Sequence, residues 1–124
     1  MSFNPCTVNR ETDTVTIASG DATGLSGAID LTGHVLAGIF MPAAWTTGNL
    51  TFQAAIDTIT GTYQNVFDNN GNELTVTAAA AEYLAIPPSL FYGLRFIKVR
   101  SGTSGTPVTQ GGARVLTLVG RLIA

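Results

Sequence analysis

The chain has 124 residues, enough to bury the core of one domain, and 45% of them are hydrophobic while only 11% are charged. Its single cysteine excludes an intramolecular disulfide, and its net charge of −2 argues against a nucleic-acid-binding protein. Soluble chains average about 25% charged residues. So little charge fits a protein that packs against copies of itself or another protein, or simply a neutral, threonine-rich β surface.

The start of the chain, MSFNPCTVNRETD, is polar and lacks the apolar run of a signal peptide. The apolar run VLAGIFM, residues 35–41, is too short to span a bilayer. We therefore expect synthesis in a cytoplasm and no membrane partner. Residues 1–13 are expected to form an N-terminal arm, and residues 14–124 a single β domain.

Apolar residues recur with a period of two along the first half of the domain, which is the period of β-strands. The segment TVTIA places Val15 and Ile17 on one face, and SGAIDL places Ile29 and Leu31 together. VLAGIFM is apolar on both faces, as in a central buried strand. In LTFQAAI the alternation points four residues inward, namely Leu50, Phe52, Ala54 and Ile56.

The second half continues in short extended runs separated by turns. TYQNVFD and NELTVT flank DNNGNE, residues 68–73, whose Asn70-Gly71 pair is typical of a hairpin tip. The run TAAAAEYLA, 77–85, favours a helix by propensity, but its place between strand-like runs predicts a strand with a turn. IPPSLFYG, 86–93, predicts one helical or 3₁₀ turn near residues 87–92. LRFIKVR and ARVLTLVGRLI are the last strands.

This pattern gives about eight or nine short antiparallel strands with no long helix. It predicts an all-β, single-domain β-sandwich that is jelly-roll-like.

Charge is divided unevenly along the chain. Residues 1–93 carry one arginine and all eight acids, a net −7, whereas residues 94–124 carry five cations and no acid, a net +5. Either the basic strands pair with acidic segments of the same fold, or they form a basic face that docks on an acidic partner. The residues named for a possible interaction surface are Arg95, Lys98, Arg100, Arg114 and Trp45.

The sequence offers little for catalysis. His34 is the only histidine, and no nucleophile motif accompanies its setting in LTGHVLAG. Cys6 and His34 alone cannot hold zinc, and DNNGNE lacks the spacing of an EF-hand. We therefore expect no enzyme activity, no cofactor and no catalytic or metal site.

Trp45 is the only tryptophan, and it lies in MPAAWTTGNLTFQ between two strand-like runs. A tryptophan at such a corner can be a ligand platform or a structural plug. Because the rest of the chain offers no chemistry, we expect a plug that caps the open end of the sandwich while its N–H reaches a loop carbonyl.

Three segments carry a resemblance that covers roughly residues 15–119. They are LSGAIDLTGHVLAGIFMPAAWTTGNLTFQAAID, TYQNVFDNNGNELTV and FYGLRFIKVRSGTSGTPVTQGGARVLTLV. They resemble small virion structural proteins of tailed bacteriophages and prophages, most of all capsid decoration (cement) proteins.

The resemblance implies a protein on the capsid surface that binds the major capsid protein and associates with itself. We expect a homotrimer, because phage shells present three-fold sites. Two alternatives stay open. One is a carbohydrate- or receptor-binding β-sandwich of a tail or fibre, in which Trp45, Tyr63 or Tyr92 would gather on one exposed rim. The other is a head–tail connector or tail protein, which would form a ring.

Overall fold

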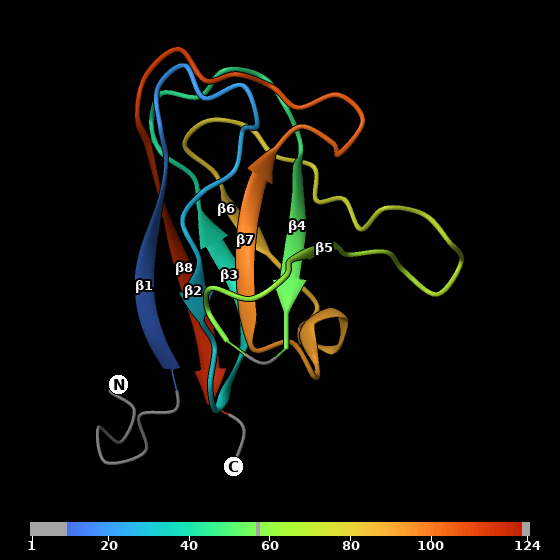
Figure 1. Ribbon diagram of the computed structural model, residues 1–124. Helices are drawn as coiled ribbons and strands as arrows, with labels where there is room; N and C mark the ends of the chain where they lie inside the picture. Colours follow the sequence, from blue (N-terminus) through green and yellow to red (C-terminus); the bar gives the residue numbers. More distant parts are fainter. Residues whose placement is uncertain (1–9, 57, 123–124) are drawn as a thin grey trace, which may run out of the picture.

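The computed structural model describes residues 10–56 and 58–122 and contains two antiparallel sheets of four strands each (Figure 1). Sheet A has the order β1-β8-β3-β6, and sheet B has the order β2-β7-β4-β5. The predicted all-β sandwich is therefore confirmed. The strands are β1 Arg10–Ile17, β2 Ile29–Asp30, β3 His34–Phe40, β4 Leu50–Ala55, β5 Gln64–Asn65, β6 Tyr83–Ala85, β7 Phe96–Ser101 and β8 Arg114–Leu122.

The strand pairing is that of a jelly roll. β4 pairs with β5, β3 with β6, β2 with β7 and β1 with β8, so the chain forms one nested antiparallel ribbon. This ribbon is folded over, because β8 also pairs with β3 and β7 also pairs with β4. Eight strands connected in this way make the double-sheet jelly roll.

The core lies between the two sheets and follows the predicted alternation. Val15, Ile17, Ile29 and Leu31 are buried, as the sequence predicts. Two aromatic rings at the centre, from β4 and the 3₁₀ turn η2 (Pro88–Phe91), meet edge to face with centroids 5.0 Å apart and are fully buried; they are Phe52 and Phe91.

The inward assignment of Ile56 is wrong, because its side chain is 73% exposed. β4 ends at Ala55, so the alternation that places Leu50 and Phe52 in the core stops one residue earlier. Ala55, the last residue of β4, is buried, but it lies on the outer face of sheet B opposite Phe96.

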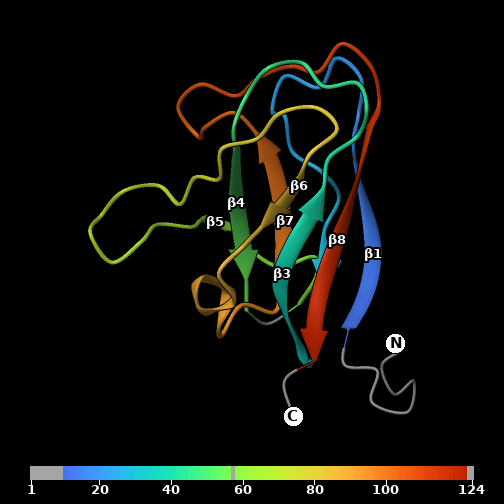
Figure 2. The ribbon, with the colours of Figure 1, turned by 180° about the vertical axis from the view of Figure 1, so that it is seen from behind.

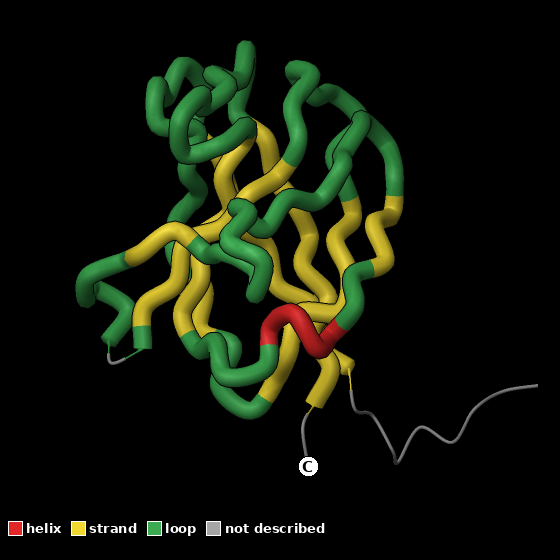
Figure 3. Tube along the Cα trace, turned by 90° about the vertical axis from the view of Figure 1, so that its right-hand side faces the viewer, coloured by secondary structure: helices red, strands yellow, loops and turns green. Residues whose placement is uncertain are grey.

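The predicted turns are present. The 3₁₀ turn η2 lies at the end of the sandwich away from the largest group of loops (Figure 3). The segment 77–85 is a turn followed by β6, and the hairpin at 68–73 is closed by the Asp68 N–H, which donates to the Asn72 carbonyl at 2.8 Å. β1 begins at Arg10, so residues 10–13 of the predicted arm belong to sheet A, and residues 1–9 lie outside the described residues.

A glycine fixes the close approach of two loop segments beside the end of β7. Gly102 has φ +87°, and a Cβ at this position would stand 2.6 Å from the Thr106 carbonyl oxygen and from the Val108 nitrogen. We expect Gly102→Ala to lower the free energy of unfolding by at least about 1–2 kcal/mol, since a left-handed conformation and a backbone clash combine. Gly105→Ala, in open space in the same loop, is the matched control, and equal losses in chemical denaturation of both variants would contradict this explanation.

Candidate functional site

Three loops meet at one end of the sandwich, at the top of Figure 1: residues 18–28, 41–49 and 102–113. We call this the loop end. The segment 66–82 lies below them, and its hairpin projects to the side. Loops held on a rigid scaffold are common places for binding residues. What fixes these loops, and what they expose, therefore decides whether they form a site.

Gln110 is the anchor of the loop end, and it is fully buried. Its side-chain oxygen accepts hydrogen bonds from the Thr46 N–H at 2.8 Å and from the Arg114 Nε at 3.1 Å. Its amide nitrogen donates to the Thr46 carbonyl at 3.0 Å and to the Ser101 hydroxyl at 2.6 Å. One side chain thus ties the loop 41–49 to the loop 102–113, which makes this part of the loop end preorganised.

Trp45 is a structural part of the same loop end. Its indole N–H donates to the Gly48 carbonyl at 3.0 Å, and its half-buried ring packs against the hydrophobic core. Both features match the structural plug that the sequence favours over a ligand platform.

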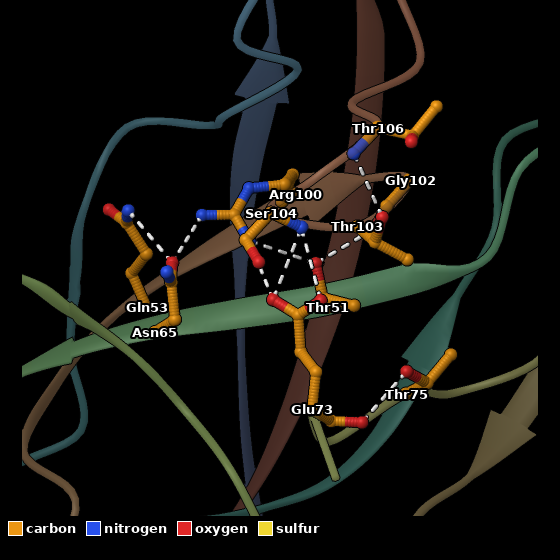
Figure 4. A network of polar contacts seen from close by, with 10 residues as sticks. All are labelled: Thr51, Gln53, Asn65, Glu73, Thr75, Arg100, Gly102, Thr103, Ser104 and Thr106. Carbon is orange, nitrogen blue, oxygen red and sulfur yellow. Dashed lines mark hydrogen bonds and ion pairs between the residues drawn. The ribbon is translucent and has the colours of Figure 1, made fainter.

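A buried ion pair holds the hairpin 68–73 in place, as Figure 4 shows. Arg100 of β7 is 3% exposed, and its guanidinium donates to Glu73 at 3.1 Å, to the Asn65 side-chain oxygen at 2.7 Å and to the Thr51 hydroxyl at 3.2 Å. The Glu73 carboxylate also accepts from the Ser104 N–H, at 3.1 and 3.2 Å to its two oxygens. This network joins the hairpin 68–73 and the loop 102–113 to sheet B.

The cations named from the sequence mostly have partners within the chain. Arg100 is buried, so its charge is not presented to a partner protein. The Arg95 Nε lies 3.4 Å from an Asp30 carboxylate oxygen, and its guanidinium stacks 4.6 Å from the Phe96 ring centroid. The Lys98 ammonium lies 4.4 Å from the centre of the Tyr63 ring. Arg95 and Arg100 thus pair with acidic residues of the same fold, as in the first of the two explanations of the charge division, whereas Lys98 contacts an aromatic ring.

Arg114 has uncharged partners instead, since its guanidinium donates to the Gln110 side-chain oxygen and, at 3.4 Å, to the Thr46 hydroxyl. Acidic groups also have local partners. The hydroxyl and backbone N–H of Thr23 hold the pKa of Asp21 below its ordinary value, and Thr32 acts in the same way, aided by Arg95, on the pKa of Asp30. Desolvation raises the pKa of Tyr63.

The three aromatic residues of the sugar-binding alternative are not gathered on one rim. Trp45 lies in the loop end, whereas Tyr92 follows η2 at the opposite end of the sandwich (Figure 1). Tyr63 lies over Lys98 on the outer face of sheet B. Since no two of them share a rim, the arrangement differs from the one that a sugar platform requires.

The outer face of sheet A is the surface that stands out in this fold, and Figure 2 shows it toward the viewer. Residues directly opposite each other in an antiparallel pair lie on the same face, so the register defines its members. Val15, Leu116 and Leu118 point into the core, and their neighbours in the strands point outward. Arg121 of β8 lies on this face at the end of the sheet. The other outward residues are Thr12, Thr14, Thr16, Val115, Thr117, Val119, Gly38, Phe40, Tyr83 and Ala85.

None of these ten residues is charged, and three of them expose large apolar side chains. Phe40 is 51%, Tyr83 48% and Val115 49% exposed. The rings of Phe40 and Tyr83 pack with centroids 4.6 Å apart, and Gly38 leaves the space that the Tyr83 ring occupies. A neutral, partly apolar sheet face of this kind is typical of a surface that contacts another protein.

Sequence reasoning missed this face because its four strands come from separate parts of the chain. The signal was present in the outward residues of each strand, but strand order is needed to bring Thr14 beside Thr117 and Thr117 beside Phe40.

The described residues contain no group of three or more histidine, cysteine or acidic side chains placed to hold a metal ion. Cys6 lies outside the described residues. His34 lies at the start of β3, where its Nδ1 is 3.0 Å from the Thr32 carbonyl and its Nε2 is 3.7 Å from Glu11. Within residues 10–56 and 58–122, no helix has the length and apolar character needed to cross a bilayer.

Comparisons of this chain with protein-family models, with curated proteins and with solved structures found no match.

Proposed function

We propose that this chain is a structural protein of a tailed-phage virion, a capsid decoration (cement) protein that binds the outer shell and stabilises contacts between subunits of the major capsid protein. The observation that carries the proposal is the outer face of sheet A, which is uncharged apart from Arg121 at its end and exposes Phe40, Tyr83 and Val115. The resemblance of residues 15–119 to such proteins supports the same function.

Adhesion needs no catalytic group. It needs a rigid body, a neutral contact face and many copies, because a repeating shell adds avidity to contacts that are weak one at a time. The jelly roll supplies the rigid body, and Gln110 and the Arg100–Glu73 pair hold its loops in place. Jelly rolls also occur in lectins and other proteins, so the fold alone does not choose the function.

The test compares shells with and without the protein for resistance to heat. We expect added protein to bind the shells and to raise the temperature at which they open. Val115→Lys, which puts a charge on the outer face of sheet A near the start of β8, is expected to weaken binding. Ile56→Lys is the control, because Ile56 is an apolar residue outside that face and, at 73% exposed, is even more accessible than Val115 at 49%.

Absence of binding to shells by the wild-type protein overturns the proposed function. If Val115→Lys binds as well as Ile56→Lys, the outer face of sheet A is not the contact surface.

A further inference from the structure

The two sheets have four edges, and three of them are very short. β6 has three residues and β2 and β5 have two each, whereas β1 has eight. Short edge strands protect a sheet from pairing with other chains. β1 contains no proline, and its register against β8 runs without a bulge from Arg10 to Ile17. Among the described strands, β1 is therefore the one edge long enough to accept a further strand.

The backbone of β1 shows which groups face this edge. The Thr14 N–H donates to the Asp13 side-chain oxygen at 2.8 Å, a contact that fits an N–H on the side of β1 away from β8. Because backbone groups alternate sides along a strand, the N–H and C=O groups of Thr12 and Thr14 point to the free edge. At the upper end, Ser26 bridges to Ile17 and limits the free edge to the part of β1 before it.

A small cleft of about 80 Å³ opens beside this edge, between β1 of sheet A and β2 of sheet B. Apolar side chains line its base, those of Ile29, Leu31 and Leu118, and carboxylates stand around it, those of Glu11, Asp13 and Asp30.

Two of these carboxylates have cationic neighbours in the chain. Asp30 contacts Arg95, and Glu11 lies 3.7 Å from the His34 ring. Glu11 nevertheless remains 76% exposed, and Asp13 is exposed and makes its contact with a backbone N–H. The edge therefore presents negative charge next to free backbone groups.

We propose that the free edge of β1 binds an extended strand of another protein, one that carries a lysine or arginine directed at Glu11 and Asp13. The partner's carbonyl accepts the Thr14 N–H, and the Asp13 carboxylate that held this N–H turns to the partner's cation. The methylene groups of that cation lie over the apolar base of the cleft while its charge stays at the rim. This inference goes beyond the proposed function and does not depend on it.

Charge also disfavours a second copy of β1 as the partner in the register centred on Thr12. In a symmetric antiparallel pair of β1 strands, the same face of each strand lies on the same side of the sheet. Even-numbered residues of one copy therefore lie opposite even-numbered residues of the other, and odd-numbered opposite odd-numbered. If the pair is centred on Thr12, whose backbone groups are free, Glu11 lies opposite Asp13 of the other copy. Like charges placed directly opposite destabilise a strand pair. A basic strand removes this repulsion and gains two ion pairs.

The test selects binders from a displayed library of random nine-residue peptides on the intact protein. We expect the enriched peptides to alternate β-branched residues with lysine or arginine. Their affinity should fall about tenfold in the double variant Glu11→Gln/Asp13→Asn, which removes two exposed ion pairs. Asp21→Asn, at the loop end, is the matched control and should leave affinity unchanged. Shell binding is measured separately, so the two proposals can fail independently.

A second arm tests the backbone contact. Two versions of an enriched peptide are made, one methylated at the odd-numbered amide nitrogens and one at the even-numbered ones. Only one version should lose binding, because only one side of the peptide backbone faces β1. Selection of no peptide, enrichment without basic residues, or equal affinity for the double variant overturns the proposal. A dimer linked through β1 in ultracentrifugation, abolished by Thr14→Asp, also overturns it.

Discussion

Replacing Arg100 with methionine is expected to lower the free energy of unfolding by about 3–5 kcal/mol, as measured by chemical denaturation. The side chain is 3% exposed and donates to Glu73, Asn65 and Thr51. Its removal leaves the Glu73 carboxylate, whose side chain is 14% exposed, without its cation. The cost of an unpaired, largely buried charge is the main part of the expected loss.

Arg95→Met is the matched control for this prediction. Arg95 also pairs with a carboxylate, that of Asp30, but the two side chains are 50% and 42% exposed. Solvent screens such a pair, and its loss should cost no more than about 1 kcal/mol. Similar losses of unfolding free energy for Arg95→Met and Arg100→Met would contradict the prediction that burial makes the Arg100–Glu73 pair the more important of the two for stability.

Phe52→Ala is expected to lower the free energy of unfolding by about 3–5 kcal/mol. Phe52 is fully buried at the centre of the jelly roll, and its ring meets Phe91 edge to face. Removing the ring leaves a cavity between the two sheets, and the surrounding strands cannot close this cavity without changing their register.

Phe67→Ala provides the comparison, because Phe67 is 54% exposed. A change at such a surface position usually stays within about 0.5 kcal/mol. If both phenylalanine variants lose the same amount in thermal and chemical denaturation, the core does not lie between the sheets at Phe52.

The strands could be predicted from the sequence because their cause is local. Alternation put Val15 and Ile17 into the core, and the Asn70-Gly71 pair predicted the hairpin tip. Ile56 shows the limit of this reasoning. The period of two continues through it in the sequence, but the strand ends at Ala55, and an ended strand no longer alternates.

The partners of the cations could not be predicted, because their cause is not local. Arg100 and Glu73 are 27 positions apart and meet only when the hairpin 68–73 folds over sheet B. The uneven charge along the chain therefore allowed two explanations. The ion pairs of Arg95 with Asp30 and of Arg100 with Glu73 fit internal pairing with acidic segments. The surface of interest thus moves from the basic strands to the neutral outer face of sheet A.

That face and the free edge of β1 are the two surfaces on which the proposed contacts with other proteins rest. The three-fold assembly expected from the resemblance stays a prediction, and ultracentrifugation of the isolated chain tests it. A monomer in that experiment contradicts the trimer but leaves the shell-binding proposal intact, because the shell itself can supply the symmetry.

The copy number of this chain in purified virions tests the proposed function most directly. Quantitative mass spectrometry against the major capsid protein gives this number. A decoration protein that covers the shell is expected in on the order of hundreds of copies, since its adhesion depends on a repeating lattice. A small ring-sized number of copies, or absence of the chain from virions, would contradict the account.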